Sequence, residues 1–531
     1  MITRLLPALL VVASLAAPLN AGAASSTYWV APGGSDASTG TEAAPWQTLQ
    51  HAVDQVDPGD TIVVRPGTYA GMRIERSGSP GAWITLSARP GAVVDRPGPD
   101  NRHDSNIELE TWSAPGTVSY WVIEGLEVEN APNWGIDVRG SEESHSHHIT
   151  IRGNHVHHNG IDSTKTGIFF AFTDDVVVVG NDSHHNGEHG IYLSNSGDRF
   201  RVDRNHLHDN ERCGLHMNGD LSLGGDGTIS NGRIVGNLID SNGAEGCAAI
   251  NLDGVTNAFI AENVIVENHA TGIAVFRQDG AVCSRNVTIV NNTIVQAADG
   301  RWGVVMGGPG CRDVTLLNNV ILTRHQWRGA IEMPTEGMPG FVSNHNIFTG
   351  RFTMDAGLSV KNLAEWRAAT GQDMASSTAS ITAVFLPGTY RHEPGGPAQD
   401  AGTATASRRD HDRVKRPTNG AWDVGAFETP MCRGHLATII GTSSNDDLEG
   451  TAGADVVVAL AGADDVHLGD GDDIACGSRG NDHIFGGAGD DAIHGQRGRD
   501  VIDGGNGFDV ANGGRGDDDC TAAEKMHSCE L

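Results

Sequence analysis

Four related segments in the middle of the chain decide the expected fold: GNHVHHNG (153–160), GNDSHHNG (180–187), RNHLHDN (204–210) and GNLIDSNG (236–243). Looser copies continue to residue 348, and the copies share an asparagine at Asn154, Asn181, Asn205, Asn237, Asn263, Asn292, Asn319 and Asn346. Successive asparagines are 27, 24, 32, 26, 29, 27 and 27 residues apart. Alternation of polar and apolar residues within each copy predicts strands, and the spacing between copies predicts a solenoid of stacked coils. The asparagine column fits a hydrogen-bonded ladder at the turns.

This pattern resembles the right-handed parallel β-helix of secreted polysaccharide lyases and their relatives. The segment PWQTLQHAVDQV (45–56) predicts a helix with one apolar face, which would cap the open end of the solenoid. The segment AWDVGAFE (421–428) resembles the closing strand of the same proteins. The resemblance implies an all-β fold class, with a right-handed parallel β-helix and an N-terminal capping helix over residues 25–430.

A second repeat occupies residues 441–521, where nine nonapeptides such as GSRGNDHIF and GGAGDDAIH follow one another without insertion. The sixth position is aspartate in all nine: Asp446, Asp455, Asp464, Asp473, Asp482, Asp491, Asp500, Asp509 and Asp518. The block resembles the hemolysin-type (RTX) repeats, in which the pattern G-G-x-G-x-D-x-U-x binds calcium. The resemblance implies a parallel β-roll with Ca²⁺ as its cofactor, held by these nine aspartates.

The charge of this block supports the same interpretation. Residues 441–521 contain 18 acidic side chains and 4 arginines, so their net charge is 4 − 18 = −14. If two nonapeptides make one turn, aspartates 18 residues apart stack, and their carboxylates supply the oxygen ligands that Ca²⁺ prefers. Without the ion the carboxylates repel, so we expect the roll to order only when calcium binds. We assign residues 431–440 to a linker and 522–531 to a C-terminal tail.

The ends and the overall charge indicate an exported protein. Residues 1–24 contain an apolar stretch followed by small residues, as in a secretory signal peptide. No later stretch of the sequence is apolar for long enough to predict a membrane span, and the net charge of −31 argues against a nucleic-acid binder. We expect a secreted, extracellular monomer. Alignment of neighbouring coils pairs Cys213 with Cys247 and Cys283 with Cys311, and the remaining cysteines suggest Cys520–Cys529 and Cys432–Cys476.

Alternate residues of each strand point outward, so stacked coils place their outward residues in columns. One column reads Asp137, Phe169, Tyr192, His216, Asn251, Ala274, Val305 and Glu332, and the next reads Arg139, Ala171, Ser194, Asn218, Asp253, Phe276 and Gly307. Both are most polar over three middle coils. The longest interval adds a loop at residues 219–232, which contains Asp220 and would turn the face into a groove.

A groove along parallel strands suits an extended, acidic extracellular polysaccharide. Lyase cleavage by β-elimination needs a neutralised C5 carboxylate, a base for the C5 proton and an acid for the leaving oxygen. We assign His216 as the base, Tyr192 as the acid or a second base, and Arg277 as the neutralising group. Substrate-binding candidates are Ser194, Asn218, Asp220, Asn251 and Asp253. Lys165, just before a predicted strand, is an alternative base.

Two other functions fit the same features. The combination of β-helix and calcium repeats is similar to secreted mannuronan C5-epimerases, but their Tyr-Gly-Phe-Asp-Pro-His type of motif is absent, because Ile191 and Leu193 flank Tyr192. The other alternative is a non-catalytic solenoid that binds glycan or a surface and is anchored through calcium.

A second polar column is rich in histidine. Counted from each ladder asparagine, its outward positions are His155, His157, Asp182, His184, His206 and His208 on three successive coils. These residues suit either a solvent-exposed imidazole stack or a site for Zn²⁺ or another borderline metal.

Overall fold

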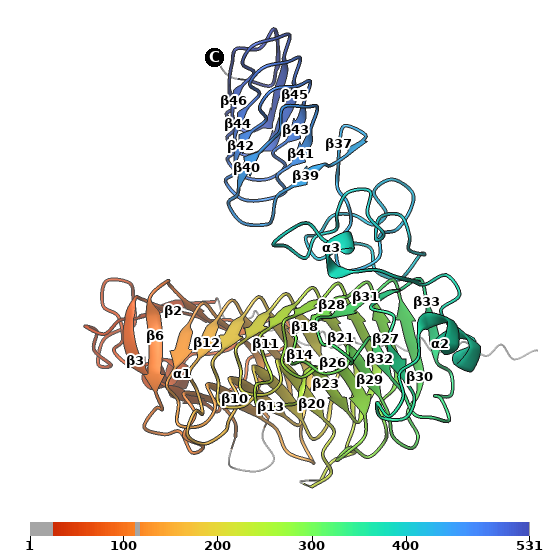
Figure 1. The fold of residues 1–531 in the computed structure, drawn as a ribbon. Helices are drawn as coiled ribbons and strands as arrows, with labels where there is room; N and C mark the ends of the chain where they lie inside the picture. The colour runs from red at the N-terminus through yellow and green to blue at the C-terminus, as the bar shows by residue number, and fades with distance from the viewer. Residues whose placement is uncertain (1–24, 112–116, 223, 530–531) are drawn as a thin grey trace, which may run out of the picture.

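The computed structural model describes residues 25–111, 117–222 and 224–529, and it is an all-β parallel helix followed by a smaller β-roll (Figure 1). The expected signal peptide at residues 1–24 lies outside the described residues. Three parallel sheets of 13, 11 and 12 strands, here sheets A, C and B, run the length of the solenoid. Within the described ranges no helix combines the length and the apolar character that a membrane crossing requires.

Sheets A and C form two of the three faces of each coil. Sheet A consists of β1 (Thr27–Val30), β2 (Thr61–Val64), β5 (Ile84–Ala88), β8 (Ser119–Glu124), β11 (Ser146–Arg152), β14 (Thr173–Val179), β17 (Gly197–Asp198), β18 (Arg201–Asp203), β21 (Ile229–Val235), β24 (Val255–Ala261), β27 (Arg285–Val290), β30 (Arg312–Leu317) and β33 (Val342–Asn344). Sheet C consists of β4 (Met72–Ile74), β7 (Ile107–Leu109), β10 (Ile136–Arg139), β13 (Ile168–Ala171), β16 (Ile191–Ser194), β20 (Leu215–Asn218), β23 (Ala248–Asp253), β26 (Thr271–Phe276), β29 (Val304–Met306), β32 (Ile331–Glu332) and β35 (Phe352–Thr353).

Sheet B forms the third face. It consists of β3 (Gly67–Ala70), β6 (Ala92–Arg96), β9 (Glu127–Glu129), β12 (His155–His157), β15 (Asp182–His184), β19 (His206–His208), β22 (Leu238–Asp240), β25 (Val264–Val266), β28 (Thr293–Gln296), β31 (Val320–Thr323), β34 (Ile347–Phe348) and β36 (Ser377–Thr378). Inward residues of all three sheets, such as Ile151, Val156 and Phe170, are fully buried in one continuous core.

Asparagine ladders hold the turns of the solenoid together, which confirms the first predicted column. The backbone N–H of Asn181 donates to Oδ1 of Asn205 at 3.0 Å, and the backbone N–H of Asn205 donates to Oδ1 of Asn237 at 2.9 Å. A second ladder, five residues further along each coil, was missed: Asn159, Asn186, Asn210, Asn242 and Asn268 form the same bonds. Its signal was visible in the sequence as the second asparagine of GNHVHHNG.

The two ends of the solenoid are closed by helices. The predicted N-terminal cap is α1 (Leu49–Gln55), which begins after Thr48 and buries Leu49, Ala52 and Val53. The far end is closed by α2 (Leu363–Thr370), whose Trp366 is completely buried and stacks on Phe352 at 4.9 Å between ring centroids.

The predicted closing strand at residues 421–428 is wrong. This segment forms no strand and lies instead across the outer face of sheet B, where the N–H of Gly425 donates to the carbonyl of Asn318 at 2.7 Å. Val424, Ala426 and Phe427 pack there with Val295, Val320 and the short helix α3 (Ile381–Val384). This segment therefore shields the apolar outward residues of sheet B on these coils from solvent.

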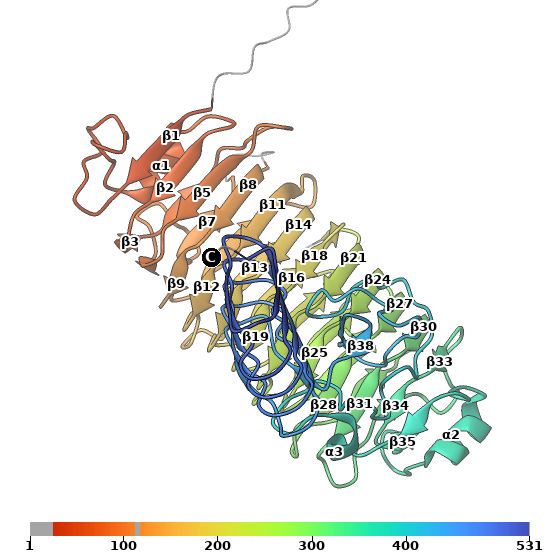
Figure 2. The same cartoon turned by 90° about the horizontal axis from the view of Figure 1, so that it is seen from above.

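The roll is a separate stack of coils above the solenoid (Figures 1 and 2). One sheet consists of β39 (Ile439–Ile440), β41 (Val456–Val458), β43 (Ile474–Cys476), β45 (Ala492–Arg497), β47 (Val510–Arg515) and β49 (Lys525–His527). The other consists of β40 (Asp447–Glu449), β42 (Asp465–His467), β44 (His483–Phe485), β46 (Val501–Asp503) and β48 (Asp519–Thr521). β39 and β49 extend the roll into the predicted linker and tail.

All four predicted disulfides are present. The Cα atoms are 5.3 Å apart in Cys213–Cys247 and 4.7 Å apart in Cys283–Cys311, and both bonds join neighbouring coils. Cys432–Cys476 spans 5.8 Å and ties the hairpin β37 (Met431–Cys432) and β38 (His435–Leu436) to the roll. Cys520–Cys529 spans 5.6 Å at the C-terminal end.

Candidate functional sites

The polar columns of sheet C have the predicted register. Tyr192 pairs with Phe169 and His216, and His216 pairs with Asn251 on the next coil. Ser194 pairs with Asn218, which pairs with Asp253. The alternation of buried Leu193, Met217 and Leu252 with these polar residues turns the polar side chains outward from the core.

Tyr192 and His216 form the centre of this block. Their rings meet edge to face with centroids 4.5 Å apart, and Nδ1 of His216 lies 2.8 Å from Nδ2 of Asn251. Nδ2 of Asn218 lies 3.5 Å from Oη of Tyr192. Oδ1 of Asn218 is buried and has no hydrogen-bond partner among the described residues.

Burial sets the protonation of this pair. It raises the pKa of Tyr192 above its ordinary value and lowers the pKa of His216 to about 4, with a further lowering by the charge of Arg212. At neutral pH the block therefore holds a phenol that can donate a proton and an uncharged imidazole that can accept one.

His189 is part of this block and was missed. It is 4% exposed, and its ring stacks on His216 with centroids 4.5 Å apart. Burial and the neighbouring His216 lower the pKa of His189 well below its ordinary value. His189 precedes the strand β16 rather than lying on it, so the strand alternation that located Tyr192 gave no signal for it.

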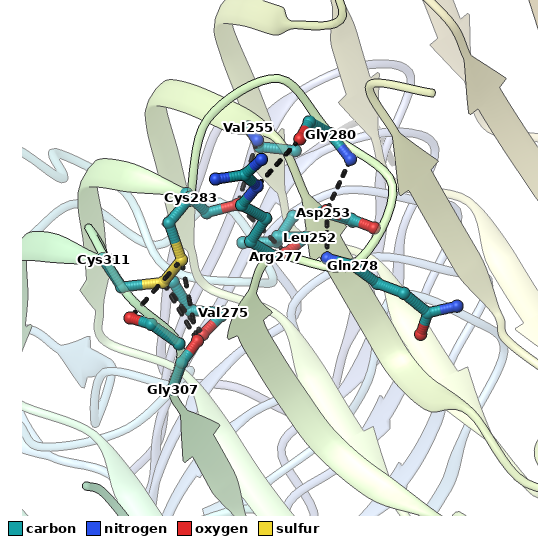
Figure 3. Close-up of a disulfide and its surroundings, with 12 residues drawn as sticks. Leu252, Asp253, Val255, Val275, Arg277, Gln278, Gly280, Cys283, Gly307 and Cys311 are labelled. Carbon is teal, nitrogen blue, oxygen red and sulfur yellow. Dashed lines mark hydrogen bonds between the residues drawn. A yellow bond between two sulfur atoms is a disulfide. The ribbon is translucent and has the colours of Figure 1, made fainter. Parts of the chain in front are cut away.

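The remaining candidates are held by turns beside the block. Asp253 is 2% exposed, and its carboxylate accepts the backbone N–H groups of Gln278, Asp279 and Gly280 at 2.9, 2.7 and 3.2 Å. These three bonds hold the turn at residues 278–280 in place. Arg277 is exposed, and its Nε donates to the carbonyl of Gly280 at 3.1 Å, beside the Cys283–Cys311 disulfide (Figure 3).

The predicted loop is shorter than expected, because residues 229–232 belong to β21. Its described residues, 219–222 and 224–228, lie against the same turn, where the N–H of Ala281 donates to the carbonyl of Gly227 at 2.9 Å. Asp220 forms an isolated bridge with Gly280, and its carboxylate accepts bonds from the backbone and hydroxyl of Ser222. Ser194 is buried beside Tyr192. The alternative base Lys165 places its Nζ 5.0 Å from the ring centroid of Trp134.

In the roll, aspartates 18 residues apart stack as predicted. The backbone N–H of Asp473 donates to Oδ1 of Asp491 at 2.9 Å, and that of Asp482 donates to Oδ1 of Asp500 at 3.0 Å. Only one carboxylate oxygen is used in this way. The second oxygen, Oδ2, is buried without a hydrogen-bond partner among the described residues in Asp464, Asp473, Asp482, Asp491, Asp500, Asp509 and Asp518.

These unpaired oxygens fit a hard cation. Burial and the charge of stacked neighbours raise the pKa of Asp482 to about 7 and the pKa of Asp491 to about 6. A Cβ at Gly477, Gly486 or Gly495 would lie 2.4, 2.5 or 2.2 Å from the nearest of these oxygens, so glycine keeps the space around them open. Bound Ca²⁺ would supply the positive charge that neutralises the stacked carboxylates.

The first two aspartates of the repeat differ from the others. Oδ2 of Asp455 accepts the N–H of Thr451 at 2.7 Å and its hydroxyl at 2.9 Å, and Thr442 bonds the carboxylate of Asp446 in the same way. Threonine at the second position of these two nonapeptides is therefore a hydrogen-bond partner of the carboxylate.

Comparison with known proteins agrees with this division of the chain. Residues 28–197 match the model of the Pel9A-like right-handed β-helix region. Residues 440–475, 477–502 and 494–524 match the RTX calcium-binding nonapeptide repeat. The chain therefore carries a right-handed β-helix that is similar to the Pel9A-like region over residues 28–197, followed by a segment that is similar to RTX repeats. The RTX match indicates calcium binding by the roll.

Residues 113–326 of the solenoid also match a model described as periplasmic copper-binding protein (NosD). Over 141 residues the chain is 34% identical to pectate lyase PEL9 of Emericella nidulans, which covers 24% of this chain and 33% of that protein. Over 173 residues it is 28% identical to pectate lyase L of Dickeya dadantii, covering 30% and 37%. The chain thus spans about a third of the length of these relatives.

A solved structure of pectate lyase Pel9A superposes with a TM-score of 0.49 and 19% identity, covering 77% of this chain and 97% of that one. The RTX repeats, the four disulfides and the similarity to pectate lyases are consistent with an extracellular location.

Proposed function

We propose that the protein is secreted and cleaves an acidic, uronic-acid polysaccharide by β-elimination on sheet C. The observation that carries this proposal is the contact between Tyr192 and His216, an uncharged phenol and an uncharged imidazole on one outward column. The pectate lyases that share part of the solenoid support the substrate class.

In this mechanism His216 takes the C5 proton and Tyr192 protonates the departing O4 oxygen. In the structure Nδ2 of Asn251 faces Nδ1 of His216, so the base role requires the Asn251 amide to turn over. Its oxygen then accepts a proton from Nδ1, and Nε2 keeps its lone pair. Arg277 neutralises the C5 carboxylate, since its exposed guanidinium lies on the turn beside the block. Asn218, Ser194 and Asn251 bind sugar hydroxyls beside the reacting pair, and Asp220 borders the substrate.

The test is ultraviolet absorbance of unsaturated uronide ends after incubation with pectate, alginate or a glycosaminoglycan. Tyr192→Phe and His216→Gln should each lower kcat by about 10²–10⁴-fold, the usual contribution of a positioned acid or base. Glu332→Gln, at the far end of the same column, should leave the rate unchanged. The proposal fails if none of the substrates gives absorbance or new reducing ends.

The pH profile gives an independent test. Because His216 acts as a base with a pKa of about 4, kcat/KM should stay level from neutral pH to about 5 and fall as His216 becomes protonated near pH 4. A fall centred near the ordinary histidine value of about 6.5 would contradict the role of this buried imidazole. A C5-epimerase would use the same proton abstraction, and altered uronate signals in NMR spectra of an uncleaved polymer would favour it.

A second candidate function is binding of acidic glycan without cleavage, and a cavity of about 500 Å³ favours it. Five arginines line this cavity, in a chain whose net charge is −31: Arg204, Arg233, Arg408, Arg409 and Arg413. Burial and the charge of Arg413 lower the pKa of Arg204, as expected for cations that lack enough anionic partners. This function would be selected if the wild type shows no turnover and binds pectate. That binding should persist in the Tyr192→Phe and His216→Gln proteins and be lost in Arg204→Gln/Arg413→Gln.

A further inference from the structure

The outer face of sheet B carries a compact group of histidines and acids that neither proposed function uses. On β12, β15 and β19 the middle residues Val156, Ser183 and Leu207 are fully buried, so the residues on either side of them point outward. We call these outward residues the histidine face: His155, His157, Asp182, His184, His206 and His208.

Strand register stacks the histidine face in two columns. His155 pairs with Asp182, which pairs with His206, and His157 pairs with His184, which pairs with His208. The rings of His157 and His184 are 5.0 Å apart between centroids and inclined by 5°, and those of His184 and His208 are 4.5 Å apart. The parallel coils therefore bring five imidazoles and one carboxylate into contact.

The ring nitrogens converge closely enough to share an ion. Nε2 of His155 lies 2.6 Å from Nε2 of His184. One ring nitrogen of each histidine also lies within 4.8 Å of a carboxylate oxygen of Asp182. On its other side, Oδ1 of Asp182 lies 3.1 Å from Nε2 of His208 and 3.8 Å from Nδ1 of His206. Asp182 is thus common to two donor sets, each with two imidazole nitrogens.

Carboxylates around the face orient the imidazoles. Asp240 lies 2.8 Å from Nε2 of His206, Asp209 lies 2.7 Å from Nδ1 of His208, and Glu127 lies 3.3 Å from Nε2 of His157. An acidic partner on the second ring nitrogen is the usual support of a metal-binding histidine, because it sets the tautomer and raises the basicity of the ligating nitrogen.

We propose that the histidine face binds a divalent transition-metal ion, Zn²⁺ or Cu²⁺, through His155, Asp182 and His184, with His206 and His208 completing the second donor set at Asp182. Imidazole nitrogens with one carboxylate suit these borderline ions, whereas Ca²⁺ prefers sites made of oxygen alone. The protein would then bind two kinds of metal at two kinds of site: calcium at oxygen ligands in the roll, and a transition-metal ion at nitrogen ligands on the solenoid.

The test uses the full-length protein in millimolar calcium, so that the roll is saturated, and titrates it with Zn²⁺ alone by calorimetry. We expect at least one Zn²⁺ per chain, and at least a tenfold weaker affinity in His155→Gln/His184→Gln and in Asp182→Asn. His269→Gln removes an imidazole that is 41% exposed and pairs with Asp299 outside the face, so it should bind Zn²⁺ as the wild type does.

Electron paramagnetic resonance of the Cu²⁺ complex supplies a readout of the ligands themselves. Nitrogen hyperfine coupling should be present in the wild type and reduced in His155→Gln/His184→Gln. Circular dichroism and the melting temperature establish that each variant is folded, and the single change Asp182→Asn keeps the side-chain shape if the double variant does not fold. The proposal is overturned if the wild type does not bind Zn²⁺. It is also overturned if His155→Gln/His184→Gln and Asp182→Asn both bind Zn²⁺ as the wild type and the control His269→Gln do.

Discussion

At the scale of single residues, buried asparagines join one coil to the next. Asn237 is fully buried. Its Oδ1 accepts two hydrogen bonds from Asn205, one from the backbone N–H at 2.9 Å and one from the side-chain Nδ2 at 3.0 Å. Asn237→Ala should lower the free energy of unfolding by about 2–4 kcal/mol, because it leaves buried donors of Asn205 without a partner. Urea unfolding followed by tryptophan fluorescence measures the loss. Asn419→Ala removes two exposed hydrogen bonds, one to Asp400 and one from the backbone N–H of Ala421, and should change stability by less than about 0.5 kcal/mol. Similar losses of stability in both proteins would refute the ladder's role.

At the scale of elements, helices close the solenoid because its end coils would otherwise expose core and unpaired strand edges. Trp366 of α2 is fully buried against Phe352, and its Nε1 donates to Asp373 at 2.8 Å. Trp366→Ala should cost about 3–5 kcal/mol and promote association of the uncovered ends. Thermal unfolding and light scattering check both effects. Leu358→Ser, at a position that is 90% exposed near the same end, is the matched control; a monomeric Trp366→Ala protein with unchanged melting temperature would contradict the capping role.

At the scale of the whole molecule, the two domains should differ in their dependence on calcium. Scanning calorimetry of the full chain should show separate transitions for solenoid and roll in millimolar calcium, and chelator should abolish that of the roll, because its stacked carboxylates then lack a counter-charge. Asp473→Asn/Asp491→Asn should weaken calcium binding roughly tenfold from a Kd of about 10⁻⁴–10⁻³ M. Asp446→Asn should have a smaller effect, since Thr442 already bonds that carboxylate. A single, chelator-insensitive transition would rule out calcium-dependent folding of the roll.

Periodicity in the sequence was sufficient for much of this structure. The outward columns through Tyr192 and His216, the ladder through Asn205 and the stack of Asp473 on Asp491 all follow from counting along the repeats. The physical reason is that parallel coils repeat one backbone path, so residues at equal positions in successive repeats become neighbours. The same argument placed Cys213 beside Cys247 and Cys283 beside Cys311.

Only the tertiary structure determined the contacts made by residues that do not follow the sequence repeats. It placed His189 against His216, committed Asp253 to the turn at Gln278–Gly280, and laid residues 421–428 over sheet B instead of at its end. Each of these contacts depends on how a turn or a non-repeating segment leaves the coil. Side-chain alternation within strands therefore carries no information about these contacts. They are determined by the packing of the complete chain, because buried polar groups form their hydrogen bonds only in the folded structure.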